Sequence, residues 1–431
     1  MKFIRIRFNI KSQLLLITLV LILGVSCQSF ALFQNTESDQ SYTEFTGEIE
    51  DAENGDELVF ADLEIENTNI RTVTNTEGEF LLKIPNEYLD RNLIISYLGF
   101  EKLTVKISEL KKEDNKFSLT RLVTNLGEVN INIPKSAGEI VTEMLKRKDI
   151  NYLNQSTLMT AFYRETIKKR RQNASLAEAV VDVYKQPYNS DRTDKVILLK
   201  SRKSTNYSKL DTIALKLQGG PFNTLYSDLI KYQEFVFSDD FLDVYDFKME
   251  NSTRIDNRLV YVISFKQKPQ ILSPLYFGKI YVDAATYALN SAIYDLNVEN
   301  EELAANLFVQ RKPRRVSVFP TEAKYRVDYK NKDGKWYYGY SNIQLTFKVD
   351  WKGKLFNSVY TLNSEMVITD WEMNSTDTNK VKNQLRPSVI LADEASGFQD
   401  PEFWGEYNII EPEKSIEQAI RKINRQTDRS K

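Results

Sequence analysis

The start of the chain is punctuated by turn residues at regular intervals, and this pattern restricts its fold more than any other feature. The segments 45–51 (FTGEIED) and 63–68 (LEIENT) alternate apolar and polar residues, which is the period of a half-buried strand. Gly78 and Gly99 interrupt later strands. Because glycine reaches positive φ without a Cβ penalty, each marks a turn or a tight corner. Six short strands at this spacing predict a small β-sandwich.

Four groups of residues within these strands carry a family resemblance. They are Gly47, Ile49 and Asp51; Leu58, Ala61 and Leu63; Thr74, Gly78 and Phe80; and Tyr97, Leu98, Gly99 and Phe100. In this order and spacing they resemble the carboxypeptidase-regulatory-like module, a transthyretin-like sandwich, over residues 44–120. Asn75 stands where the family usually has Asp. The resemblance implies a non-catalytic sandwich, common at the N-terminus of envelope proteins that include outer-membrane TonB-dependent receptors.

Two residue types that build many active sites are scarce. The chain has no histidine, so it lacks the commonest general base and the commonest zinc ligand. Its one cysteine is Cys27, which excludes internal disulfides and cysteine metal clusters. A zinc carboxypeptidase needs histidine ligands, so this activity is excluded despite the family's name. No cofactor or metal site is predicted. The acidic segment 51–57 is interpreted as a hairpin turn, because its spacing differs from that of an EF-hand loop.

Residues 1–31 are predicted to be a secretory signal peptide. They hold four basic residues and no acid, and the apolar run 14–25 is shorter than the roughly 20 residues of a membrane-spanning helix. Small residues before the boundary predict cleavage between Ala31 and Leu32. The alternative is a lipoprotein with Cys27 as the lipidated residue, although Gly24 replaces the usual leucine. Either product is exported, to the periplasm or to an association with the outer membrane.

Length and composition predict a second, larger domain. A chain of 431 residues exceeds one ordinary core, and 12% aromatic residues favour sheet over helix bundle. Residues 32–43 are predicted to be a flexible lead-in and residues 121–135 a linker. Residues 136–425 then form the large domain, which begins with a helix because Ser136 and Glu139 make a capping box.

After this helix the chain is predicted to form mostly long strands. Hairpins are predicted at 283–286 and at Asp333-Gly334, the second within a longer loop. The predicted fold class is therefore mainly β. An N-terminal transthyretin-like sandwich is followed by a large curved antiparallel sheet with a few helices on one face.

The hairpin at 278–296 carries a second resemblance. Its matching residues are Gly278, Ile280, Val282, Asp283, Thr286 and Leu289. In this spacing they resemble a hairpin of the lipoprotein-carrier (LolA-like) proteins. The resemblance implies a half-barrel that shelters acyl chains.

Four large aromatic residues are candidates for a ligand or partner surface, namely Trp336, Tyr338, Tyr340 and Trp404. Such rings stack on sugars or line lipid grooves; the alternative is that they alternate between the core and the surface of a hairpin. The basic run 168–171 is a candidate for binding anionic lipid phosphates, or else a solvated hairpin tip.

The C-terminal segment is predicted to pack on the large domain and to end in a helix. Phe403, Trp404 and Tyr407 are expected to dock on the sheet. Pro412 suits the first turn of a helix that closes the core. Its apolar residues, Ile416, Ala419, Ile420 and Ile423, have helical spacing.

These features predict an exported, non-catalytic envelope protein that binds a lipidic or glycan ligand, or an outer-membrane or periplasmic protein partner. Acids outnumber bases, 60 to 58, even before the basic leader is removed, which argues against nucleic acid as a partner. Two alternatives stay open. One is a glycosidase-like hydrolase, because two carboxylates need no histidine. The other is an outer-membrane β-barrel component, against which the basic C-terminal end argues.

Overall fold

The computed structural model describes residues 41–122, 135–170, 172–205, 219–255, 258–308, 314–353, 355–374, 382–397 and 403–414. The predicted cleavage site at Ala31 and Leu32, the alternative lipidation site Cys27, most of the linker and the predicted C-terminal helix lie outside these ranges. No helix within them is long and apolar enough to cross a membrane.

The N-terminal module is a sandwich of two small sheets, as predicted. Its strands are β1 (Tyr42–Asp51), β2 (Asp62–Ile65), β3 (Arg71–Val73), β4 (Glu79–Pro85), β5 (Asn92–Ser96), β6 (Leu103–Lys106) and β7 (Asn115–Leu119). One sheet has the order β4-β1-β7 and the other β3-β2-β5-β6. The prediction of six strands omitted β7, which pairs parallel to β1 and is short, with Phe117 and Leu119 as its apolar residues.

The turns of the module follow the glycine signals. Gly78 has φ +71°, and the side-chain oxygen of Asn75 accepts hydrogen bonds from the backbone N–H groups of Glu77 (2.8 Å) and Glu79 (3.0 Å). An aspartate would accept the same bonds, so asparagine at this position preserves the turn. Gly99 has φ +83° and forms the tight corner between β5 and β6.

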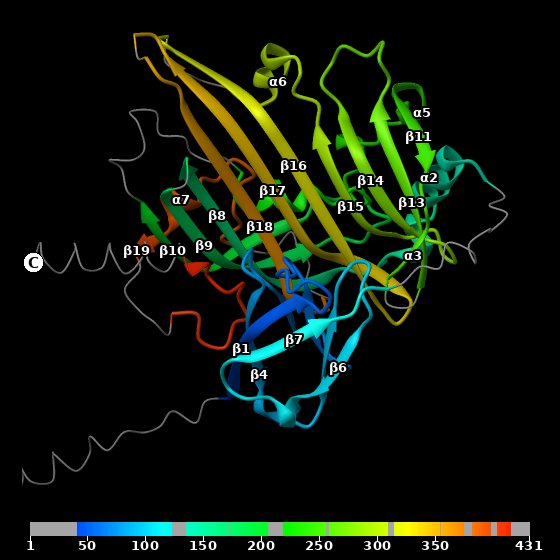
Figure 1. Ribbon diagram of the computed structural model, residues 1–431, viewed down its shortest axis with the longest axis vertical. Helices are drawn as coiled ribbons and strands as arrows, with labels where there is room; N and C mark the ends of the chain where they lie inside the picture. The colour runs from blue at the N-terminus through cyan, green and yellow to red at the C-terminus, as the bar shows by residue number, and fades with distance from the viewer. Residues whose placement is uncertain are drawn as a thin grey trace, which may run out of the picture. The chain divides into compact units, whose positions relative to one another are not determined.

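One large sheet dominates the rest of the described chain (Figure 1). Its strands are β8 (Thr157–Lys169), β9 (Gln172–Lys185), β10 (Lys195–Thr205), β11 (Tyr245–Met249), β12 (Thr253–Ile255), β13 (Arg258–Gln267), β14 (Tyr276–Asp283), β15 (Leu289–Leu296), β16 (Val316–Lys332), β17 (Lys335–Trp351), β18 (Ser358–Met373) and β19 (Ser396–Gly397). They follow the order β11-β13-β14-β15-β16-β17-β18-β8-β9-β10-β19, and β12 pairs with β13. Neighbours are antiparallel except β10 and β19. The mainly β fold class is confirmed.

Both predicted hairpins are present, and one of them differs in detail from expectation. The β16–β17 turn consists of Asp333 and Gly334 alone, because Lys332 pairs directly with Lys335. The longer loop expected there is absent, since both turn residues have positive φ and allow the strands to continue to the turn. At the β14–β15 turn, Asp283 accepts hydrogen bonds from the backbone and hydroxyl of Thr286.

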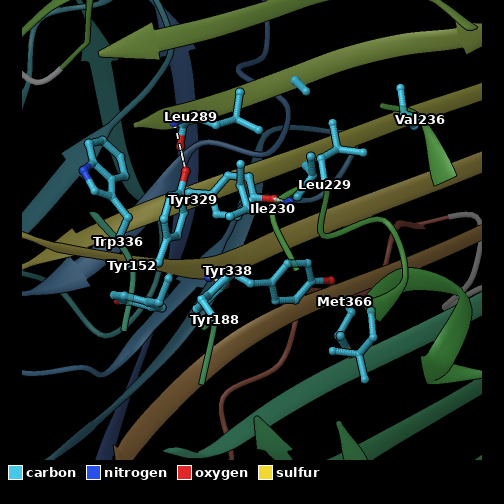
Figure 2. Close-up of a cluster of buried hydrophobic side chains, with 14 of the residues drawn as sticks. Tyr152, Tyr188, Leu229, Ile230, Val236, Leu289, Tyr329, Trp336, Tyr338 and Met366 are labelled. Carbon is cyan, nitrogen blue, oxygen red and sulfur yellow. Dashed lines mark hydrogen bonds between the residues drawn. The ribbon is translucent and has the colours of Figure 1, made fainter. Parts of the chain in front are cut away.

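Short helices and loops cover one side of the large sheet, here called the inner face. The helices are α2 (Ala137–Lys146), α3 (Lys148–Asn151), α4 (Pro221–Leu225), α5 (Phe241–Val244), α6 (Glu301–Phe308) and α7 (Leu391–Glu394), with 3-10 turns η1 (Asn86–Tyr88) and η2 (Ile107–Glu109) in the module and η3 (Gln233–Phe235) between α4 and α5. The predicted capping box of Ser136 and Glu139 starts α2. Figure 2 shows Leu229, Ile230 and Tyr338 within the inner-face core, where all three are buried. The chain's own side chains therefore fill this face.

The opposite side of the large sheet, the outer face, packs against the module and the C-terminal segment. Phe162 and Tyr340 from the sheet share a buried cluster with Val73 of the module and with Trp404 and Ile410. The described residues from Thr43 onward group as one compact unit, so the module and the sheet belong together.

Candidate functional site

A cavity of about 300 Å³ lies where the β2–β3–β5 side of the module faces strands β15, β16 and β17. Its lining is strongly polar and rich in cations. Arg71 and Lys102 come from the module, and Arg258, Arg326 and Lys330 come from the large sheet. The acids of the lining are Asp62, Glu64 and Asp328, so positive charge is in excess.

Arg71 on β3 is the most deeply buried of these cations, with 0% of its surface exposed. Its Nε donates to Asp62 at 2.9 Å, and its Nη2 also contacts this carboxylate. Lys330 of β16 approaches the other Asp62 oxygen at 2.8 Å, so one carboxylate joins the module to the sheet. Burial by itself would raise the pKa of Asp62, but the charges of Arg71 and Lys330 outweigh it and keep the pKa below its usual value.

Gly339 on β17 makes room for the Arg71 side chain. A Cβ added at Gly339 would lie 2.6 Å from Arg71 Nη1 and 2.8 Å from Lys330 Cγ. Gly339 is also a β-bulge residue, because Asp328 pairs with Tyr340 and Tyr329 pairs with Tyr338, which leaves it unpaired. Glycine at this position therefore permits close approach of a module side chain to the backbone of the sheet.

Three buried donors of the cavity lining lack hydrogen-bond partners among the described residues. They are Arg71 Nη1, the Tyr340 hydroxyl and Trp336 Nε1. Tyr340 is 1% exposed and Trp336 is 2% exposed, so neither side chain is accessible to bulk solvent. Each of these three atoms is itself inaccessible to solvent, so they lie within the walls of the cavity and do not open into it.

Two further arginines are held in place beside aromatic rings. Arg326 donates to Asp328 at 2.8 Å and lies 5.6 Å from the ring of Phe60. Arg258 donates to Asp283 at 2.6 Å and lies 5.4 Å from the ring of Trp336. Each guanidinium keeps further N–H groups besides the one that bonds its aspartate. The cavity thus combines cations and aromatic surfaces, which suits an anionic, hydrogen-bond-accepting ligand.

Comparison with known families assigns the module that contributes Arg71. Residues 45–131 match the CarboxypepD_reg-like domain. No curated protein matches the chain in sequence. The CarboxypepD_reg-like domain therefore supplies one wall of the cavity, and the large sheet supplies the other.

Several solved structures are distantly similar to the chain. MucB in complex with MucA(peri) is 12% identical, covers 56% of this chain and 100% of its own, and has a TM-score of 0.19. A LolA superfamily protein from Nitrosomonas europaea is 9% identical, covers 57% and 96%, and has a TM-score of 0.23. A putative membrane-associated protein from Bacteroides fragilis is 10% identical, covers 77% and 98%, and has a TM-score of 0.15. These likenesses are too distant to indicate a ligand.

The four aromatic residues proposed from the sequence are all buried, and the structure separates them. Trp336 and Tyr340 line the cavity. Tyr338 lies on the inner face, where its hydroxyl donates to the carbonyl of Thr224 at 3.2 Å. Trp404 packs edge-on against Phe162 on the outer face. In the basic run, Lys168 pairs with Glu413 at 3.1 Å.

Sequence reasoning did not find Arg71, Arg326 or Lys330. Charged residues in a sheet-rich chain carry no local signal that they face a cavity. The one usable signal was Gly339, because an isolated glycine inside an aromatic strand suggests a bulge or a close approach. That signal does not say which side chain approaches.

A second buried charge cluster lies on the inner face around Lys185. Its Nζ is 2.7 Å from both Asp194 and Asp228, and Asp228 also accepts hydrogen bonds from the hydroxyls of Tyr188 and Tyr329. All of these groups are buried and paired with one another. The cluster therefore fixes the segment around Asp228 to the sheet. Within the described ranges, no group of three or more acidic or cysteine residues is placed to hold a metal ion.

Proposed function

We propose that this chain is an exported, non-catalytic binding protein of the cell envelope whose ligand occupies the cavity beside Arg71. The observation that carries the proposal is the set of cations that line one cavity, Arg71 and Lys102 from the module and Arg258, Arg326 and Lys330 from the large sheet. An anionic ligand that accepts charge-assisted hydrogen bonds would bind here more strongly than a neutral one.

The lining favours an acidic sugar or a sugar phosphate over a neutral or lipidic ligand. Positive charge is in excess, and the rings of Phe60, Trp336 and Tyr340 offer flat surfaces for stacking. The volume is at the lower end of the range for ligand sites in proteins. By contrast, the inner face, where a lipid carrier would place acyl chains, holds the buried side chains of Leu225 and Leu229.

Two of the three acids of the cavity lining are ion-paired. Asp62 is paired with Arg71 and Lys330, and Asp328 is paired with Arg326. A glycosidase needs one protonated carboxyl and a second carboxylate that reaches the sugar or its water. Burial raises the pKa of the third acid, Glu64, which suits the first role, but the ion-paired aspartates suit the second poorly, and this supports binding without catalysis.

The test compares a cation of the cavity lining with a buried tyrosine on the opposite face of the sheet. Lys102→Gln removes an exposed positive charge, so it should leave the melting temperature unchanged. It should also weaken binding of glucuronate or glucose 6-phosphate by roughly tenfold, the worth of one hydrogen bond to a charged group. Isothermal titration calorimetry, with glucose as the neutral probe, measures the affinities.

Tyr338→Phe is the control. The Tyr338 hydroxyl is bonded to Thr224 and Ser341 on the opposite face, so its removal should lower stability and leave affinity unchanged. The proposal fails if neither acidic sugar binds, or if the two variants change affinity equally.

A further inference from the structure

The strands β16, β17 and β18, with β8 beside β18 as far as Lys169, form an arm that extends past the end of β15 (Figure 1). Strand β15 pairs with β16 only from Lys324 to Asp328, whereas β17 pairs with β16 from Val316 onward. Residues 316–323 of β16 therefore run past the end of this pairing. At about 3.4 Å per residue, this overhang is roughly 25 Å long.

The turn that joins β17 to β18 presents two adjacent apolar side chains at the end of this arm. Leu355 is 95% exposed and Phe356 is 79% exposed. Val359, just inside β18, is also exposed at 39%. Such neighbouring large apolar residues on a protruding turn contribute nothing to the core, so their exposure calls for a binding partner.

Cations surround these apolar side chains. Lys352, Arg314 and Arg315 are exposed, and the Lys352 N–H donates to the Arg315 carbonyl at 3.0 Å, which places the two segments side by side. Arg170, at the β8–β9 turn, is exposed and donates its N–H to the Val359 carbonyl at 2.9 Å. Among the described residues of the segment 348–359, the acid is Asp350. The four cations named here outnumber it, so the described part of the tip is basic.

We propose that the tip of this arm, residues Leu355 and Phe356 with their basic neighbours, binds the surface of an anionic lipid bilayer. Both side chains are exposed at the end of the arm, and a fluid bilayer accepts such side chains without a preformed groove. Apolar side chains enter the interface, while lysine and arginine stay at the level of anionic headgroups. This site lies apart from the cavity and does not depend on its ligand.

The experiment measures binding of the purified chain to vesicles made of equal parts phosphatidylcholine and phosphatidylglycerol. Wild type should cosediment with these vesicles, and less so as salt rises, because salt screens the cations. The double variant Leu355→Ser/Phe356→Ser should bind roughly tenfold more weakly or worse, since two side chains no longer enter the lipid. In Phe356→Trp, emission from the new tryptophan should be quenched by brominated phospholipid.

Leu272→Ser is the matched control. Leu272 is 81% exposed but lies in the β13–β14 loop, away from the tip, so its substitution should leave vesicle binding unchanged. Both variants replace exposed side chains, so folding should be retained, which circular dichroism verifies. The proposal is overturned if wild type does not bind the vesicles, if the double variant binds as wild type does, or if light scattering shows that the double variant only abolishes self-association.

Discussion

The carboxyl group of Glu165 is buried on β8, where it accepts a hydrogen bond from the Tyr163 hydroxyl at 3.0 Å. Burial raises the pKa of Glu165 to about 8, from an ordinary value of 4.5. The folded protein therefore holds a proton on this group at pH values where the unfolded chain has lost it. Stability contributed by the neutral form is fully present below pH 4.5 and is lost as pH rises toward 8.

Glu165→Gln should remove this pH dependence. The amide keeps an acceptor for Tyr163 and carries no charge, so the variant should match wild type near pH 4.5 and exceed it above pH 8, by an amount on the order of a few kcal/mol. Thermal melts across this range provide the measurement. In this variant the stability should still fall slightly as pH rises, because burial also raises the pKa of Glu365, to about 7. Glu48→Gln, at an exposed position, is the control. An equal effect of this change would show that the pH dependence does not come from Glu165.

At the scale of single elements, local signals predicted the strands and turns well. Gly78, Gly99 and Asp333-Gly334 all lie at turns, because positive φ is a local requirement that a glycine or aspartate reveals. Regular alternation would place Trp336, Tyr338 and Tyr340 on one face. The structure places Trp336 and Tyr338 in the inner-face core and Tyr340 in the outer-face cluster, because the bulge at Gly339 reverses the alternation.

Replacement of the bulge glycine should test the contact between the module and the sheet. Gly339→Ala would place a Cβ against Arg71 Nη1, which is buried and held by Asp62, and should destabilise the protein by about 1–3 kcal/mol. Chemical denaturation measures the loss. In an Arg71→Lys background the branched guanidinium is gone, so the same substitution should cost less. Equal costs in both backgrounds would show that Arg71 is not the obstacle.

Across the whole molecule, the contacts that create the cavity join segments that are distant in sequence, and for this reason the sequence did not reveal them. Lys330 and Asp62, or Arg71 and Gly339, show no local pattern that predicts their meeting. The docking of Trp404 was expected from its size and apolar character, and it is buried. The surface on which Trp404 docks could be identified only from the structure. Likewise, only the structure shows that the outer face packs against both the module and the C-terminal segment.

The C-terminal segment connects the module to the sheet. Asn408 bonds the backbone of Lys83 in the module through both amide atoms, at 2.7 and 3.0 Å. The Thr72 hydroxyl of the module donates to the Ile409 carbonyl at 2.8 Å. On the sheet side, Arg164 donates to the Ile410 carbonyl at 2.6 Å. One short segment thus satisfies polar groups of both parts, which should make their unfolding cooperative.

Truncation after Asp400 should therefore lower the melting temperature and split a single calorimetric transition into two. Asn408→Ala should have a smaller effect in the same direction, about 1–3 kcal/mol, because it leaves buried backbone groups of Lys83 unpaired. Asn54→Ala, in an exposed turn of the module, is the control and should change little. If the truncated chain melts as wild type does and instead loses association with other envelope components, the segment is a partner site and not a structural connection.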